Sequence, residues 1–224
     1  MEDVRQFVLA YIEGRVGSKQ FLKELYDKPE IFEWLQSIVP KGKTRTLYKF
    51  DQCYSKIIEK TEVPYLIHDV IDEIWQSPGH SFSGRELNTF SLIANLVSEA
   101  FPDIVLHKST AIEDKFNFLL DACPEYLDSE AIENSGIFEE LMKQLPESMP
   151  KTKRIKEFRK RIKDMFYVEG QKYPRWIQGS EWPLSKAGKP TKFLRQKSVH
   201  NGEVCCYYFL DMDTKEEIEV MQAY

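Results

Sequence analysis

The pattern of hydrophobic residues changes near residue 167, and this change limits the folds that the chain can adopt. Before it, apolar residues recur at intervals of three and four, as in "EDVRQFVLAYIEG", which is typical of amphipathic helices. After it, the segment "YPRWIQGSEWP" at 173–183 breaks any helical pattern with prolines and a glycine. Three strand-like runs follow, "TKFLRQK", "EVCCYYFLD" and "KEEIEVMQAY". The chain therefore combines a helical part with a group of strands.

Glycine and proline divide the helical part into short elements. Gly14 and Gly17 interrupt the first helix, and Pro29 suits the first turn of the third, so three helices are predicted within the first 40 residues. A polar connection with an extended piece at 44–50 comes next. The further predicted helices cover residues 52–60, 64–76, 85–101, 110–122, 129–145 and 152–166.

The three strand-like runs predict a small antiparallel sheet at the C-terminus. Asn201-Gly202 between the first two runs is a strong hairpin signal. A lone three-strand meander is only marginally stable in water, so it needs helices to pack against. We therefore predict an α+β fold, with a mostly helical acidic region at 1–167 and the Trp/Pro-rich segment and sheet at 168–224. The two parts are expected to form one folded unit.

Composition and charge argue against several classes of function for this chain. The 224 residues carry a net charge of −5, which divides into −11 for residues 1–150 and +6 for residues 151–224. An acidic N-terminal part should repel nucleic acid. No apolar run approaches the length of a membrane helix and no signal peptide is recognisable, so a cytoplasmic protein with no membrane contact is expected. The scattered cysteines and histidines predict no metal site, and no motif indicates a cofactor or a catalytic nucleophile.

Two clusters of carboxylates stand on predicted helices. They could serve as ordinary solvated surface or as a surface that attracts a basic protein partner, because electrostatic complementarity speeds and selects association. No nearby histidine is expected to complete a catalytic set for either cluster. The candidate partner-binding residues are Asp69, Asp72, Glu73, Glu130, Glu133, Glu139 and Glu140.

The helix predicted at 152–166 is strongly basic. An apolar stripe would face the core, while Arg159, Lys160 and Arg161 would lie among the exposed cations. This face could bind phosphates, or it could be a solvated surface that pairs with the acidic part of the chain. These three residues are the candidate nucleic-acid contacts.

The Trp/Pro segment has two interpretations. Its aromatic residues could stack on a small ligand that Arg175 and its polar neighbours orient. Alternatively the indoles are buried and their N–H groups find partners in a polar turn, while the prolines hold the backbone extended. The second interpretation makes the segment a wedge between sheet and helices. The residues of this structural motif are Pro174, Trp176, Gln178, Trp182 and Pro183.

Residues 170–212 resemble the recurrent motif of the bacterial YwqG family, a group of uncharacterised β-rich proteins. Pro174, Trp176 and Gln178 match its first element, and "GKPTKFLRQK" matches the strand that follows. Thr191 stands where the family pattern has methionine, and Ser185–Ala187 replace its cysteines, so the resemblance implies no metal or thiol role here.

The opening "FVLAYIEGRVGSKQFLKELYD" is similar to the start of colicin-type and polymorphic-toxin immunity proteins. This resemblance, together with the acidic helical part, implies a non-enzymatic immunity protein that binds a basic toxin domain. The alternative is a nucleic-acid-associated defence or regulatory protein that uses the basic helix at 151–163.

Overall fold

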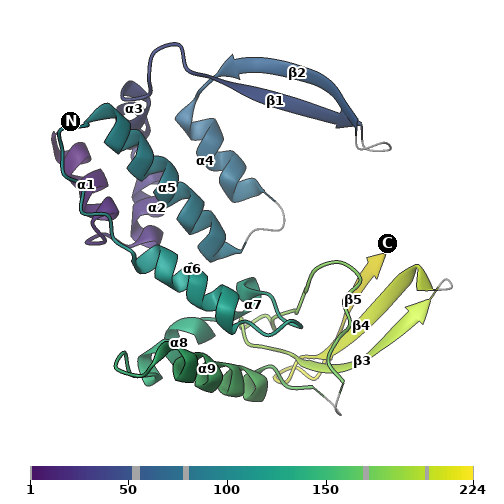
Figure 1. Cartoon of the computed structure of the whole chain (residues 1–224). Coiled ribbons are helices and arrows are strands. Elements are labelled where there is room, and N and C mark those ends of the chain that lie inside the picture. Colours follow the sequence, from purple (N-terminus) through teal and green to yellow (C-terminus); the bar gives the residue numbers. More distant parts are fainter. Residues whose placement is uncertain (1, 52–55, 78–80, 169–171, 200–201, 224) are drawn as a thin grey trace. The chain divides into compact units, whose positions relative to one another are not determined.

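The structure is a computed structural model that describes all residues except 1, 52–55, 78–80, 169–171, 200–201 and 224. Helices dominate, and a three-stranded antiparallel sheet lies at the C-terminus, so the predicted α+β class is confirmed. The chain forms two compact units, residues 1–113 and 114–224 (Figure 1). None of the helices in the described residues is both long and apolar enough to cross a membrane.

The first unit packs its helices around one apolar core. Tyr11 stacks on Phe21 with ring centroids 3.9 Å apart, and both are fully buried beside Ile71 and Ile93. The three helices predicted within the first 40 residues are confirmed, as is the long helix predicted at 85–101. The helices are α1 (Glu2–Ile12), α2 (Ser18–Asp27), α3 (Pro29–Ser37), α4 (Ile67–Gln76) and α5 (Phe82–Ala100).

An antiparallel ribbon interrupts the first unit between α3 and α4. It consists of β1 (Thr44–Asp51) and β2 (Lys56–Pro64), and we call it the β1–β2 ribbon. The extended piece predicted at 44–50 is confirmed, but the helix predicted at 52–60 is wrong over residues 56–60, and residues 52–55 lie outside the described chain. The β-branched residues between Ile57 and Val63 favour a strand, and pairing with β1 stabilises it.

The second unit contains four helices within the described residues, followed by the sheet. These helices are α6 (Ala111–Ala122), whose first turn carries the boundary between the units, α7 (Ser129–Asn134), α8 (Ile137–Gln144) and α9 (Lys151–Met165). The helix predicted at 129–145 is divided in two because Gly136 adopts a positive φ of 73° between α7 and α8.

The sheet has the strand order β3-β4-β5, with strands β3 (Lys192–Val199), β4 (Val204–Leu210) and β5 (Glu217–Ala223). Val199 pairs with Val204 across the predicted Asn-Gly hairpin, which confirms the hairpin, although residues 200–201 themselves lie outside the described chain. The central strand buries Tyr207 and Phe209 against Phe158 and Ile162 of α9.

The position of the boundary between the units differs from the sequence expectation of one folded unit that changes character at residue 167. The chain divides between Glu113 and Asp114. Residue 167 instead marks the place within the second unit where helices give way to the sheet. Helices α6–α9 belong with the sheet because their apolar stripes share one core with β3 and β4.

Candidate functional site

Three of the predicted acidic residues lie together on α4 in the first unit. Ile67 and Ile71 bury one side of this helix, which leaves Asp69, Asp72 and Glu73 on its solvent side. The side chains of Asp69 and Glu73 are 48% and 63% exposed. We call these three carboxylates the α4 acidic face. The Asp72 side chain is only 29% exposed, so Asp69 and Glu73 are the more accessible members.

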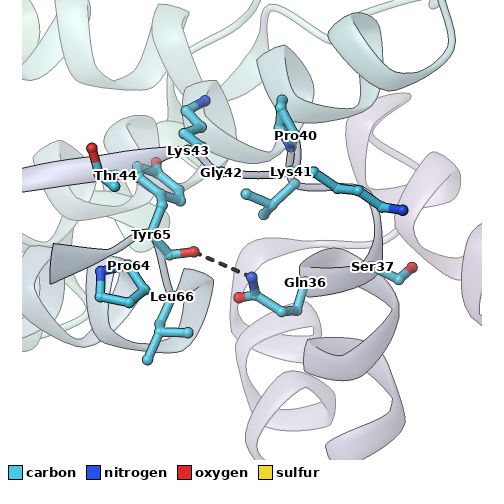
Figure 2. A pocket seen from close by; sticks show the side chains of 11 residues that line it. Gln36, Ser37, Pro40, Lys41, Gly42, Lys43, Thr44, Pro64, Tyr65 and Leu66 are labelled. Atoms are coloured by element: carbon cyan, nitrogen blue, oxygen red, sulfur yellow. Dashed lines mark hydrogen bonds between the residues drawn. The ribbon is translucent and has the colours of Figure 1, made fainter.

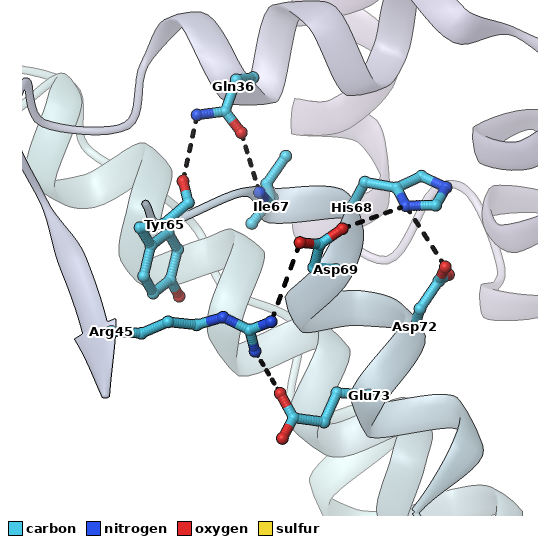
Figure 3. Close-up of polar contacts among 8 residues, drawn as sticks. All are labelled: Gln36, Arg45, Tyr65, Ile67, His68, Asp69, Asp72 and Glu73. Atoms are coloured by element: carbon cyan, nitrogen blue, oxygen red, sulfur yellow. Dashed lines mark hydrogen bonds and ion pairs between the residues drawn. The ribbon is translucent and has the colours of Figure 1, made fainter. Parts of the chain in front are cut away.

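Arg45 of β1 holds two of these carboxylates in place (Figure 3). Its guanidinium contacts Glu73 and lies 3.9 Å from Asp69. Only 18% of the Arg45 side chain is exposed, so this cation lies between the ribbon and the helix rather than in solvent. The arrangement restricts the carboxylate conformations and compensates one of their three negative charges.

Asp72 is positioned by one residue of α2 and one of its own helix. The Tyr26 hydroxyl of α2 donates a hydrogen bond of 2.7 Å to its carboxylate. His68 Nδ1, one turn earlier on α4, lies 3.3 Å from it (Figure 3), so a histidine does lie beside this cluster, contrary to the sequence expectation. Burial raises the pKa of Tyr26, and its hydrogen bond to Asp72 raises it further, so the phenol remains a proton donor. These contacts orient Asp72 in the folded protein.

Gln36 of α3 anchors the start of α4. Leu66 at the N-cap provides no side-chain acceptor, and the Ile67 N–H donates instead to Gln36 Oε1 at 2.8 Å. Gln36 Nε2 donates to the Tyr65 carbonyl at 3.2 Å. Figure 3 shows this amide between the two backbone groups, and Figure 2 shows its hydrogen bond to the Tyr65 carbonyl. It fixes the orientation of the helix that carries the acidic face.

A hollow of about 420 Å³ lies beside Gln36 at the base of the ribbon (Figure 2). Lys43 on its wall lies 4.8 Å from the centroid of the Tyr65 ring and 3.7 Å from Glu99, so its ammonium group has partners within the unit. The described lining residues include lysines, apolar side chains and the hydroxyl groups of Ser37, Thr44 and Tyr65, and no Asp, Glu or His is among them. They do not bring together the acid, base and nucleophile that a hydrolytic site requires.

The predicted acidic residues of the second unit divide into two kinds. Glu130 in the first turn of α7 and Glu139 and Glu140 in the first turn of α8 stand where negative charge stabilises a helix N-terminus. Glu133 is different because only 2% of its side chain is exposed and its carboxylate pairs with Lys115 Nζ at 3.1 Å. The predicted partner contact is therefore wrong for Glu133, which belongs to the interior.

The basic helix α9 uses part of its charge inside the second unit. Arg159 donates to the carbonyls of Asp121, at 2.6 Å, and Ala122, at 3.3 Å, which lie at the C-terminal end of α6. Arg161 donates to Gln144 Oε1 at 2.8 Å. Lys160 is exposed between them. Two of the three predicted nucleic-acid contacts thus also hold neighbouring helices.

Replacing Arg159 with alanine should therefore lower the free energy of unfolding of the second unit by about 1–2 kcal/mol, because it removes a cation that caps a helix C-terminus. The matched variant Lys160→Ala changes an exposed neighbour and should cost less than about 0.5 kcal/mol. Urea unfolding followed by circular dichroism measures both. Equal stability of the two variants would contradict the capping role.

Trp182 of the Trp/Pro segment is packed as the second interpretation predicts, whereas Trp176 is only half-buried and lines an open groove together with Arg175. Trp182 is 4% exposed, donates its indole N–H to the Thr191 carbonyl at 3.1 Å and meets Phe166 and Phe209 edge to face. Trp176 is half-buried and donates to the Tyr126 carbonyl at 3.0 Å. The two indoles join the sheet to Phe166, which follows the end of α9, and to the turn at Tyr126 in the same unit.

The remaining residues of the structural motif pack or form hydrogen bonds that fix the backbone of the segment. Pro174 is buried, and the Pro183 carbonyl accepts a hydrogen bond of 2.7 Å from the Thr191 hydroxyl. Gln178 Nε2 donates to the Ala223 carbonyl at 2.7 Å, which ties the segment to the end of β5. Thr191, at the position where the YwqG pattern has methionine, therefore has a polar structural role.

Two residues that the sequence reasoning missed fix this segment from the sheet. The Tyr207 hydroxyl donates to the Arg175 carbonyl at 2.7 Å and accepts from the Ile177 N–H at 3.0 Å. Gln222 Oε1 accepts from Ile177 and Gln178, and its Nε2 donates to the Gly179 carbonyl at 2.7 Å. A glutamine in an otherwise alternating strand was the available signal, because an inward-facing amide requires buried partners.

An open groove of about 730 Å³ runs beside this segment. Tyr126 and Tyr173 line it, but their rings stack on each other at 3.8 Å, so a ligand does not find both ring faces free. Burial raises the pKa of Asp128 on the same wall, while the Ala131 N–H that donates to its carboxylate lowers it. The Asp128 carboxylate already serves as the N-cap of α7, where it accepts a hydrogen bond from the backbone.

The fold and the site were compared with known proteins. A comparison with protein-family models, with curated proteins and with solved structures gave no match. The resemblances to YwqG-like and immunity proteins therefore remain predictions. In the described part of the chain no three His, Cys, Asp or Glu side chains form a group that could hold a metal ion.

Proposed function

We propose that this chain is a non-enzymatic immunity protein that binds a basic toxin domain in the cytoplasm and blocks its active surface. The observation that supports this proposal is the α4 acidic face, in which Arg45 and Tyr26 hold exposed carboxylates in defined positions. Ordered carboxylates lose less side-chain entropy on binding than free ones, so they suit the recognition of lysine and arginine side chains.

The proposed inhibition is electrostatic and steric. A surface that binds polyanions is basic, and fixed carboxylates can occupy the positions of the phosphates. Binding through exposed charges should be fast at low ionic strength and slower as salt screens the attraction. Inhibition of this kind requires that the chain cover a surface, and it requires no chemical step.

The test is co-expression with a basic toxin domain encoded by a neighbouring gene, together with a binding measurement between the two purified proteins. We expect survival of the host cells with the unchanged chain. The variant Asp69→Asn/Glu73→Gln should bind about tenfold more weakly or worse, mostly through slower association. The control Asp103→Asn/Glu147→Gln removes the same charge from exposed positions outside the α4 acidic face and should bind normally.

Two results would overturn the proposal. One is the absence of both binding and protection with the neighbouring basic domain. The other is equal loss of affinity in the test and control variants, which would indicate a response to net charge rather than to the α4 acidic face. A circular dichroism spectrum of each variant verifies that it is folded.

A stripe of lysines favours a second candidate, a nucleic-acid-associated defence or regulatory protein. Lys153, Lys156 and Lys160 are exposed and recur at helical spacing along α9. Titration with single- and double-stranded nucleic acid at two salt concentrations tests this function. Salt-sensitive binding that Lys153→Ala/Lys156→Ala/Lys160→Ala abolishes would favour it over the toxin-binding proposal.

A further inference from the structure

The β1–β2 ribbon presents large apolar side chains to solvent. Tyr48 and Phe50 are 50% and 55% exposed, and Ile57 and Ile58 are 41% and 57% exposed. Figure 1 shows the ribbon extending away from the helices of the first unit. An isolated two-stranded ribbon is marginally stable in water, and clustered exposed apolar residues mark interaction surfaces. This ribbon therefore has the character of an incomplete sheet.

The incomplete edge is that of β2. Among the described residues β2 pairs with β1 alone, so the backbone groups along its other edge have no ladder partner. Figure 1 shows β2 on the side of the ribbon away from α4. Among the described residues β1 also pairs with β2 alone, but Arg45 near the start of β1 contacts α4. An unpaired edge is a template for one more strand.

The side chains of β2 indicate which strand fits. In antiparallel pairing about a two-fold axis, each residue meets the one at equal distance on the other side of the axis. An axis at Thr61 sets Lys60 against Glu62 of a second copy, and Glu62 against its Lys60. Lys60 and Glu62 lie on one face of the ribbon, opposite Tyr48 and Thr46 of β1. In the same register Ile58 lies opposite Pro64 of the second copy.

We propose that two copies of this chain dimerise by antiparallel pairing of β2 with β2, so that the two ribbons form one four-stranded sheet. Two Lys60–Glu62 pairs and a Thr61–Thr61 pair fix its register. A lysine on an edge strand normally discourages pairing with another strand. Here Glu62 follows Lys60 by two residues, so only a strand with a glutamate opposite Lys60 and a lysine opposite Glu62 pairs favourably. This inference does not depend on the proposed toxin binding.

Sedimentation equilibrium of the full chain at increasing concentration tests the proposal. We expect a monomer–dimer equilibrium in the micromolar range, because a strand-to-strand contact buries little area. Glu62→Lys and Lys60→Glu each place like charges opposite one another twice, so each should raise the dimer dissociation constant about tenfold or more. The control Glu147→Lys changes the charge equally at an exposed position outside the ribbon and should leave the dimer unchanged.

A mixture of the two ribbon variants gives the decisive result. Glu62→Lys and Lys60→Glu should be monomers alone and form a heterodimer when mixed, because each then supplies the charge that the other needs. Recovery on mixing also shows that neither variant is misfolded. A monomeric wild-type chain at every concentration, a dimer indifferent to both variants, or a mixture without association would each overturn the proposal.

Discussion

The variant Trp182→Ala should lose about 3–5 kcal/mol of unfolding free energy. Trp182 is 4% exposed and lies among Phe166, Phe193 and Phe209. Its removal leaves a cavity at the junction of helix and sheet, and it leaves the Thr191 carbonyl without its indole donor.

Urea unfolding measures this loss, and hydrogen exchange locates it. Because the chain has two compact units, we expect weakened protection in residues 114–224 and little change in residues 1–113. The matched control Tyr167→Ala removes an aromatic ring that is 54% exposed in the same unit and should cost about 1 kcal/mol or less. A loss below about 1 kcal/mol for Trp182→Ala would contradict its role as a wedge.

The variant Lys115→Met should also lose about 3–5 kcal/mol, for an electrostatic reason. It removes the ammonium group 3.1 Å from Glu133, whose side chain is 2% exposed, and so leaves a buried negative charge without this partner. Methionine keeps much of the aliphatic stem, while the change also removes the ammonium group that lies 5.5 Å from the Phe138 ring centroid, so the loss includes that contact as well.

The double variant Lys115→Met/Glu133→Leu serves as the control for this pair. Removing both charges eliminates the desolvation penalty, so the double variant should recover most of the stability that Lys115→Met loses. Thermal unfolding of the wild type, both single variants and the double variant completes a double-mutant cycle. Additive losses would mean that the two side chains do not interact, contrary to the structure.

Local sequence patterns predicted most of the fold. The apolar periodicity of 85–101 and the apolar stripe of 152–166 predicted α5 and α9 within a few residues, because one buried face dictates the spacing of apolar residues. The strands after residue 190 were predictable from β-branched and aromatic runs and from Asn201-Gly202. The ribbon strand β2 was not, since its lysines and glutamates also suit a helix and only pairing with β1 selects the strand.

The candidate site was predictable only in outline. Asp69 and Glu73 could be placed on the exposed side of a helix from the sequence, but their partner Arg45 is 28 residues away from Glu73. Glu133 and Glu130 look equivalent in sequence, and yet one is buried and the other stands in the first turn of α7. Burial depends on which neighbouring elements cover a helix face, and the periodicity of apolar residues does not reveal those neighbours.

The sequence by itself determined the α+β class and the position of most helices, because these depend on local periodicity, whereas it left two interpretations of "YPRWIQGSEWP" open. The tertiary structure alone decided the division at residue 113, the ribbon in place of a helix, and the anchoring of the Trp/Pro segment by Tyr207 and Gln222. These features arise from contacts between residues far apart in the chain, and such contacts leave no regular spacing in the sequence.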